Sequence, residues 1–208
     1  DHRKENDAMR ARPLALAATG LALATVLAAC GTGTTSSTMS GMGSGSPDST
    51  ESSAGQAADV ACAQLMIPPH RQAVDMADLA LRYGRSPEGE QLAGQVASAQ
   101  GPEIETMTGW LDAWDAPLEM DMSVAHDMGG MSASGMMSDA DMAHLGRARG
   151  AGFDRMWLQM MIAHHEGAVA MARQVLTTTS DPQVAELADG VVAGQTAEIE
   201  TMRGLLAE

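Results

Sequence analysis

Side chains that can bind a soft metal ion recur at matching positions in two parts of this chain. The segment 59–111 is repeated at 154–206 with a constant offset of 95 residues and no gap. The matched pairs with metal-binding chemistry are His70 with His165, Met66 with Met161, Met76 with Met171, Gln100 with Gln195 and Glu103 with Glu198. If duplication had preserved only packing, apolar residues would match while the polar and sulfur residues diverged. Their agreement therefore indicates a site.

Each copy places a thioether and an imidazole one helical turn apart, at Met66 and His70 and at Met161 and His165. These soft and borderline donors suit copper in either oxidation state, and a carboxylate or amide behind an imidazole can fix its tautomer. The expected helical ligands are Met66, His70, Met76, Met161, His165 and Met171. The expected supporting residues are Gln100, Glu103, Met107, Gln195, Glu198 and Met202. The alternative for any one of them is a core-filling Met or a His satisfied by Gln or Glu.

The segment that joins the two copies is rich in methionine. Gly and Ser dilute the methionines, so no amphipathic helix is expected there and packing does not explain them. Thioethers bind Cu(I) and Ag(I) without losing a proton. The expected ligands in this segment are Met120, Met122, His126, Met128, Met131, Met136 and Met137. The alternatives are compositional drift in a biased loop and a sink for oxidants through Met sulfoxide.

Four helices are predicted to position these residues. Apolar residues at helical spacing indicate helices at about 59–83, 87–114, 153–178 and 181–207. Ser86 and Asp181 each precede a proline, which is a helix-start signal. Short loops make each helix pair an antiparallel hairpin, and two hairpins bury their apolar stripes by packing about a pseudo-twofold axis. The prediction is an all-α four-helix bundle, covering 58–208, with a long Met-rich crossover at 115–152.

The loop positions also predict which residues face each other within a hairpin. The expected neighbours are Met66 with Glu103, His70 with Gln100, Cys62 with Met107, Met161 with Glu198, His165 with Gln195, and Trp157 with Met202. This register collects the candidate residues in one layer of each hairpin. A Glu buried in that layer costs several kcal/mol unless it is paired or coordinated.

The amino-terminal residues of the chain indicate that the protein is exported. Residues 1–29 are interpreted as a signal peptide starting at Met9, preceded by non-native or misannotated residues, because an apolar run ends in Leu27-Ala28-Ala29-Cys30. Cys30 is the expected lipidation site, and 30–57 is expected to be a Gly, Ser and Thr tether to the outer face of the cell membrane; the alternative is ordinary signal cleavage and secretion. Residues 30–208 carry 24 acidic residues against 8 Arg and no Lys, so nucleic acid is not expected as a partner.

Motifs in both copies of the repeat resemble those of a known protein family. MIPPHRQAVDMA at 66–77, MIAHHEGAVAMA at 161–172 and the two Q-x-x-E-I-E-T-M boxes resemble the "domain of unknown function 305" family over 59–207. The resemblance implies an exported ferritin-like four-helix bundle, with some members tied to copper and silver binding or resistance. The resemblance also implies an Ile-x-His-His motif, which here falls on Ile162, His164 and His165, and it adds His164 to the expected metal ligands. The first copy has Pro69 in place of His164, so its site is expected to be the weaker one.

Cys62 stands where the second copy has Trp157, and it is either an extra soft ligand or a small core residue.

The leading hypothesis is a non-enzymatic copper-binding lipoprotein, favouring Cu(I), that acts in copper buffering, transport or resistance, with silver as a further ligand. A di-iron or di-manganese oxidoreductase is less favoured, since such sites use Glu-x-x-His and no Glu lies three residues before the candidate histidines. The third hypothesis is a metal-free assembly module with a satisfied polar network.

Overall fold

The computed structural model describes residues 48–120 and 135–207, and all regular secondary structure within them is helical. The elements are α1 (Asp48–Tyr83), α2 (Pro87–Ala113), α4 (Asp139–Arg147), α5 (Ala151–Thr178) and α6 (Pro182–Ala207). The predicted all-α class and the four long helices are therefore confirmed. Cys30 and the expected signal peptide lie outside the described residues.

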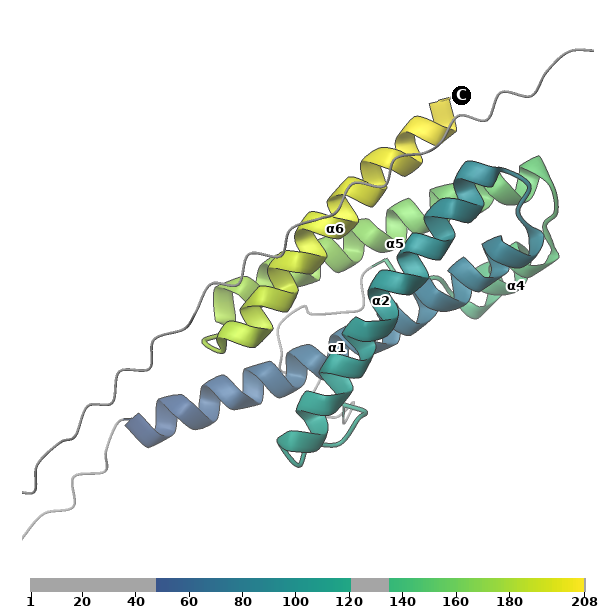
Figure 1. Ribbon diagram of the computed structural model, residues 1–208. Coiled ribbons are helices and arrows are strands. Elements are labelled where there is room, and N and C mark those ends of the chain that lie inside the picture. Colours follow the sequence, from purple (N-terminus) through teal and green to yellow (C-terminus); the bar gives the residue numbers. More distant parts are fainter. Residues whose placement is uncertain (1–47, 121–134, 208) are drawn as a thin grey trace, which may run out of the picture. The chain divides into compact units, whose positions relative to one another are not determined.

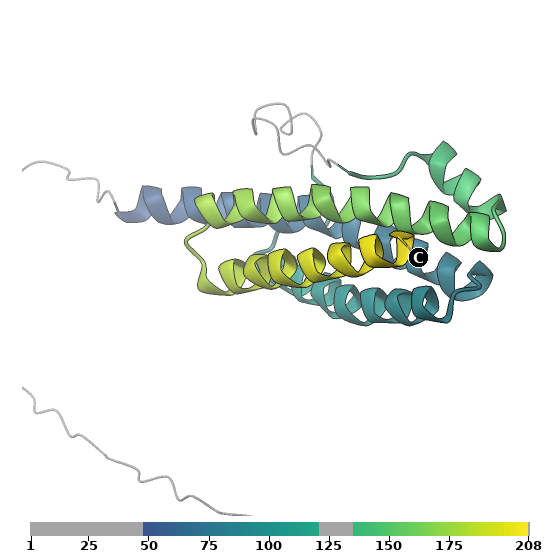
Figure 2. The ribbon, with the colours of Figure 1, turned by 90° about the horizontal axis from the view of Figure 1, so that it is seen from above.

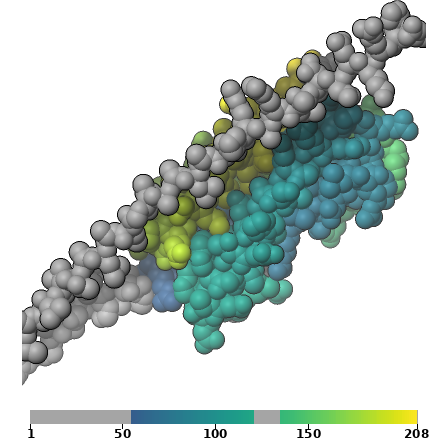
Figure 3. Space-filling view, in the orientation of Figure 1, coloured from purple at the N-terminus to yellow at the C-terminus, as the bar shows by residue number. Residues whose placement is uncertain are grey.

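The four long helices form two antiparallel hairpins, α1 with α2 and α5 with α6 (Figures 1 and 2). The hairpins meet mainly through α1 and α5, whereas α2 and α6 touch over a short stretch only. In the space-filling view, α2 forms much of the face turned toward the reader (Figure 3). The middle of the α1–α5 contact is therefore the place where the two copies of the repeat meet.

The helix starts that the sequence predicted are present in both hairpins. The Ser86 hydroxyl accepts a hydrogen bond from the Gly89 N–H at 3.1 Å at the start of α2. At the equivalent start of α6, Asp181 Oδ1 accepts from the Gln183 N–H at 2.7 Å. Each cap satisfies a backbone N–H that has no partner inside the helix, and the proline that follows needs none.

Two aspartates show how the duplicated halves hold each other. Asp59, near the start of the packed part of α1, accepts a hydrogen bond from the Thr179 hydroxyl just after α5, at 2.5 Å. Its equivalent Asp154, at the start of α5, accepts from the Arg85 N–H just after α1, at 3.0 Å. Each aspartate therefore ties down the loop of the other hairpin. This reciprocity shows that α1 and α5 run antiparallel about a pseudo-twofold axis.

Replacing Thr179 with valine is expected to lower the free energy of unfolding by about 1–2 kcal/mol, because the buried Asp59 carboxylate loses its hydroxyl donor. Urea unfolding measures the change. Thr177→Val is the matched control, since the Thr177 hydroxyl is exposed and bonds only within its own helix; its effect is expected to stay within about 0.5 kcal/mol. Equal losses in the two variants would show that the Asp59 contact contributes nothing.

Two boundaries differ from the sequence prediction. Helix α1 begins at Asp48, so ten residues assigned to the tether are helical. Extending an existing helix costs less than nucleating one, and the packed part of α1 supplies the nucleus. Helix α4 was not predicted, because the crossover was interpreted as a Gly- and Ser-diluted segment throughout. Ser138 and Asp141 form a capping box at its start, and Leu145 is buried.

Candidate metal centre

Three buried imidazoles lie at the centre of the α1–α5 contact. Helix α1 supplies His70 and helix α5 supplies His164 and His165, whose exposed fractions are 1%, 2% and 0%. The ring centroids of His164 and His165 are 6.2 Å apart. Each of these side chains lies on the apolar face of its helix, beside residues that pack in the core. The imidazoles of the two copies lie close enough for His70 to help lower the pKa of His164.

The two ring nitrogens of His70 have different neighbours. His70 Nδ1 lies 2.8 Å from the Met66 carbonyl oxygen, and because a carbonyl only accepts, Nδ1 is the donor. His70 Nε2 faces Glu103 Oε2 at 3.1 Å, without the geometry of a hydrogen bond. A metal ion that binds Nε2 would replace this contact, while the Met66 carbonyl keeps the orientation of the ring fixed.

The second copy fixes its histidine through a carboxylate. His165 Nε2 donates to Glu198 Oε2 at 2.8 Å, so in the neutral ring Nδ1 keeps the lone pair. His165 Nδ1 is buried and has no hydrogen-bond partner among the described residues. His164, the residue replaced by Pro69 in the first copy, has no partner for either ring nitrogen there. The three rings together thus present several lone pairs or N–H groups that the described protein groups leave unmatched.

His164 is held in its neutral form. Burial lowers the pKa of this imidazole to about 4, and the neighbouring His165 and His70 act in the same direction. The Pro69 carbonyl lies close enough to raise the pKa slightly, although it does not make a hydrogen bond of good geometry. A neutral imidazole at ordinary pH is the form that binds a metal ion.

The histidines contact carboxylates on the second helix of each hairpin. Glutamine was expected opposite each histidine; the contacts that the structure shows are those of Glu103 with His70 and of Glu198 with His165. The side chains of the two Glu are 26% and 17% exposed, so they are not fully buried as expected and their desolvation costs less. A long Glu side chain spans one helical turn, which the residue register alone does not include.

Two buried amides are left without partners. Neither the nitrogen nor the oxygen of the Gln100 and Gln195 side chains has a hydrogen-bond partner among the described residues. Both residues are buried and they are equivalent under the repeat. A buried polar group without a partner costs about 1–3 kcal/mol. The layer of imidazoles and amides therefore calls for a ligand or for ordered water.

Six buried methionines flank this layer as two groups related by the repeat. One apolar cluster contains Met66, Met107 and Met171, and the other contains Met161, Met202 and Met76. The 95-residue offset converts each group into the other, so each combines sulfur from both hairpins. The sequence interpretation recognised the residues, but not that Met171 joins Met66 and Met76 joins Met161. That grouping follows from the antiparallel packing of α1 on α5.

Cys62 behaves as a core residue in this structure. Burial, together with the Asp59 carboxylate, raises the pKa of the Cys62 thiol to about 12. The Cys62 Sγ lies 3.8 Å from Met66 Sδ in a weak sulfur contact. A thiol that resists deprotonation is a poor metal ligand, since the thiolate is the binding form. Of the two roles left open for Cys62, the structure favours the small core residue.

The crossover residues fall into two sets. Met120, Met136 and Met137 are described and partly buried, whereas Met122, His126, Met128 and Met131 lie outside the described residues. Met137 packs against the apolar core, as does Met142 in α4, so packing does explain these two methionines, contrary to the sequence interpretation. In the described parts of the chain, no three His, Cys, Asp or Glu side chains converge as a ready metal site. A soft ion bound in the layer would therefore need thioether donors beside the imidazoles.

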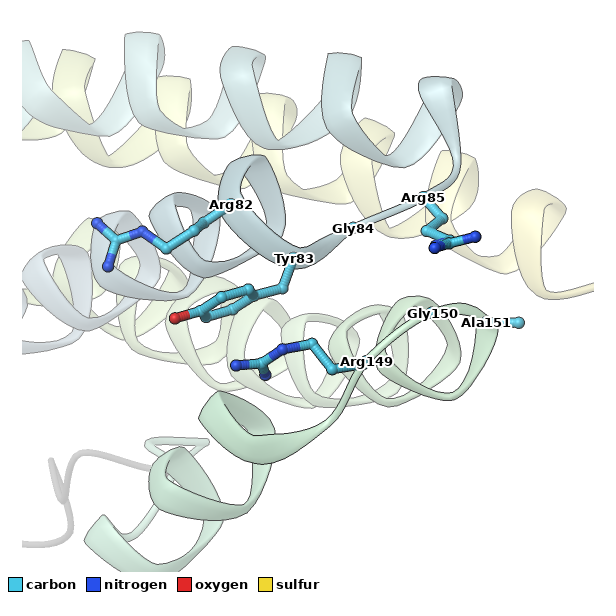
Figure 4. A pocket seen from close by; sticks show the side chains of 7 residues that line it. All are labelled: Arg82, Tyr83, Gly84, Arg85, Arg149, Gly150 and Ala151. Carbon is cyan, nitrogen blue, oxygen red and sulfur yellow. The ribbon is translucent and has the colours of Figure 1, made fainter.

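A separate surface hollow lies at the far end of α1. It has a volume of about 680 Å³ and is lined by Arg82, Tyr83, Gly84, Arg85, Arg149, Gly150 and Ala151 (Figure 4). The Arg149 guanidinium carbon is 3.6 Å from the centroid of the Tyr83 ring, and its Nη1 donates to two nearby carbonyls. These contacts hold the α4–α5 loop against α1. The hollow contains none of the predicted ligands, so it is not the candidate metal centre.

Fold and site together define a class: a helical bundle, built from a duplicated hairpin, with a buried layer of imidazoles and amides between groups of methionines. The chain belongs to the family described as "Domain of unknown function (DUF305)", which matches residues 59–206. The resemblance seen in the sequence motifs is thereby confirmed. In the described residues, none of the helices is both long enough and apolar enough to cross a membrane.

Several solved structures resemble this chain. A DUF305 protein of Streptomyces coelicolor, described as a candidate secreted protein, is 34% identical, with a TM-score of 0.69 over 72% of this chain and 92% of its own. A DUF305 fragment from Deinococcus radiodurans is 32% identical, with a TM-score of 0.63 over 72% of this chain and 95% of its own. CopM in its Cu(II)-bound form is 31% identical, with a TM-score of 0.60 over 72% and 95%. CopM has also been solved in Cu(I)-bound and Ag-bound forms.

A curated relative, the uncharacterized protein L153 of Acanthamoeba polyphaga mimivirus, is 34% identical over 55 residues. The match covers 26% of this chain and 36% of that protein. The chain thus matches about a third of the length of this curated relative, which adds no functional assignment.

Proposed function

We propose that this protein binds copper ions outside the cytoplasm, as a non-enzymatic lipoprotein that serves copper buffering, transport or resistance. The observation that carries the proposal is the buried layer of His70, His164, His165, Gln100 and Gln195, in which several ring nitrogens and all four amide atoms have no hydrogen-bond partner among the described residues. A metal-free assembly module would be expected to satisfy such a network internally. A bound ion coordinated by the free lone pairs would remove part of this cost.

The donor set favours copper or silver over iron. Thioethers are soft ligands and imidazoles borderline ones, and both are buried here next to each other. The carboxylates contact histidines and leave them available as ligands, instead of forming the Glu-rich set of a di-iron site. CopM, which shares the fold, has been solved with Cu(I), Cu(II) and Ag. These observations support copper as the first ion to test and Cu(I) as the favoured state.

Export and anchoring complete the proposal. The apolar run that ends at Cys30 supports a lipid anchor, and the Gly- and Ser-rich residues after it support a tether. Methionine is a suitable soft ligand in an oxidising compartment, because thioethers do not form disulfides. In this arrangement the crossover methionines capture ions at the surface of the bundle, and the buried layer retains them.

An anaerobic titration of residues 31–208 with Cu(I), against a chromophoric chelator, is expected to show tight binding of more than one ion per chain. Parallel titrations with Fe(II) and Zn(II) are expected to show little uptake. The physical reason is the two groups of buried thioethers beside three imidazoles, together with the crossover sulfurs.

The separate contribution of the crossover is tested by a variant with leucine at its six expected methionine ligands, Met120, Met122, Met128, Met131, Met136 and Met137. This variant is expected to bind fewer Cu(I) ions while keeping the helical circular dichroism of the wild type. Negligible copper uptake by the wild type, or preferential uptake of iron in pairs, would contradict the proposed function. A collapse of the helical signal would show instead that these methionines are needed for packing.

A further inference from the structure

The returning end of the crossover is fixed to α1 by one side chain. The Gln72 amide makes two hydrogen bonds with the backbone of Met137: Nε2 donates to the Met137 carbonyl at 2.8 Å, and Oε1 accepts from the Met137 N–H at 2.7 Å. Bonds to both the N–H and the carbonyl of one residue fix the position and the orientation of its backbone. We call Gly135, Met136 and Met137 the return limb.

The return limb also lies directly against the backbone of α5. Gly135 has a φ of +92°, and a Cβ atom there would lie 2.7 Å from the Ala163 carbonyl oxygen and 3.1 Å from Gly167 Cα. The same Cβ would be 3.0 Å from the carbonyl oxygen of His164. Only glycine fits this backbone conformation and this approach. The limb therefore sits on the turn of α5 that carries two of the three buried imidazoles, His164 and His165.

The two residues that the limb contacts are equivalent under the repeat but differ in type. Gln72 and Gly167 match at the 95-residue offset. One limb touches both: it is hydrogen bonded to Gln72 and packed against Gly167. Because a single chain segment cannot obey a twofold axis, it takes a different contact from each copy, a hydrogen-bonding amide on α1 and a small residue on α5.

We propose that Gln72, Gly135 and Gly167 are positioning residues that hold Met136 and Met137 over the α1–α5 seam next to His164. The inference rests on the proposed copper-binding function and concerns the path of the ion. Met137 is partly buried and packs against the apolar cluster that contains Met76, Met161 and Met202. The limb therefore offers sulfur donors between the crossover and the bundle, beside the turn of α5 that carries His164. Copper then passes between limb and layer by exchange of ligands, and a seated limb slows its escape.

Two variants release the limb in different ways. Gln72→Leu removes both hydrogen bonds to Met137 with little change in side-chain volume. Gly135→Ala adds a methyl group that meets the α5 backbone. The matched controls are Gln159→Leu, at an exposed position on α5, and Gly146→Ala, where a Cβ meets nothing within 4 Å. Protection of the Met137 amide from hydrogen exchange, measured on the metal-free proteins, reports whether the limb has been released.

The readout is the rate at which a chelator withdraws Cu(I) in a stopped-flow experiment. Gln72→Leu and Gly135→Ala are expected to speed withdrawal by about tenfold, the lower end of the effect of removing groups that orient metal ligands. Both controls are expected to match the wild type, and the number of ions bound at equilibrium is expected to stay the same. Unchanged rates in variants whose Met137 amide has lost protection would overturn the inference alone. A wild type that takes up no Cu(I) would overturn the proposed function as well.

Discussion

Replacing His164 and His165 together with alanine is expected to lower the affinity for Cu(I) on the order of a hundredfold or more, because even groups that only orient ligands contribute ten- to a hundredfold. These two residues supply two of the three buried imidazoles, and His165 is oriented by Glu198 at 2.8 Å. His70→Ala is expected to lower the affinity less, since the first copy has Pro69 where the second has His164. Competition with a chromophoric chelator measures both losses.

Loss of buried rings can also weaken the fold, so the comparison needs controls. His144→Ala removes an exposed imidazole on α4 and is expected to leave the affinity unchanged. Gln at both His164 and His165 keeps more of the side-chain volume than Ala does and separates lost ligands from lost packing. Circular dichroism of the metal-free variants checks that each is folded. Equal losses from His70→Ala and from the double variant would contradict the ranking of the two copies.

The stability of the metal-free protein is expected to fall by about 3 kcal/mol as the pH is lowered from 6.5 to 4, through His164 alone. Burial lowers the pKa of His164 to about 4 in the folded state, against 6.5 for an exposed imidazole. Between these two values the unfolded chain binds a proton that the folded chain does not, so unfolding is favoured as pH falls. Above pH 6.5 the contribution is complete, and below pH 4 it falls no further.

Urea unfolding at several pH values between 7.5 and 4 tests this dependence, with His164→Gln as the reference. Glutamine does not titrate, so the variant is expected to lose much less stability over the same range. The difference between the two curves isolates His164 from the carboxylates, which titrate at the lower end in both proteins. Parallel curves would show that His164 is protonated equally in the folded and unfolded states.

Much of this protein can be derived from the sequence, because the relevant information is local or repeated. Helical periodicity placed His70 and Met66 on one stripe, and the repeat singled out the matching residues of the second copy. The caps at Ser86 and Asp181 depend on contacts within three residues, so they too could be predicted. The same local reasoning could have found α4, whose capping box starts at Ser138.

The arrangement of the site required the tertiary structure. The antiparallel packing of α1 on α5 decides that His164 meets His70, and that Met76 joins the methionines of the other copy. The reach of a Glu side chain and its partial exposure decide that carboxylates, not amides, contact the histidines. The position of the return limb depends on hydrogen bonding between Gln72 and Met137, which lie more than 60 positions apart in the chain. Helix periodicity determines which side chains share a stripe, but contacts between helices depend on how whole surfaces pack, and no short stretch of sequence carries that information.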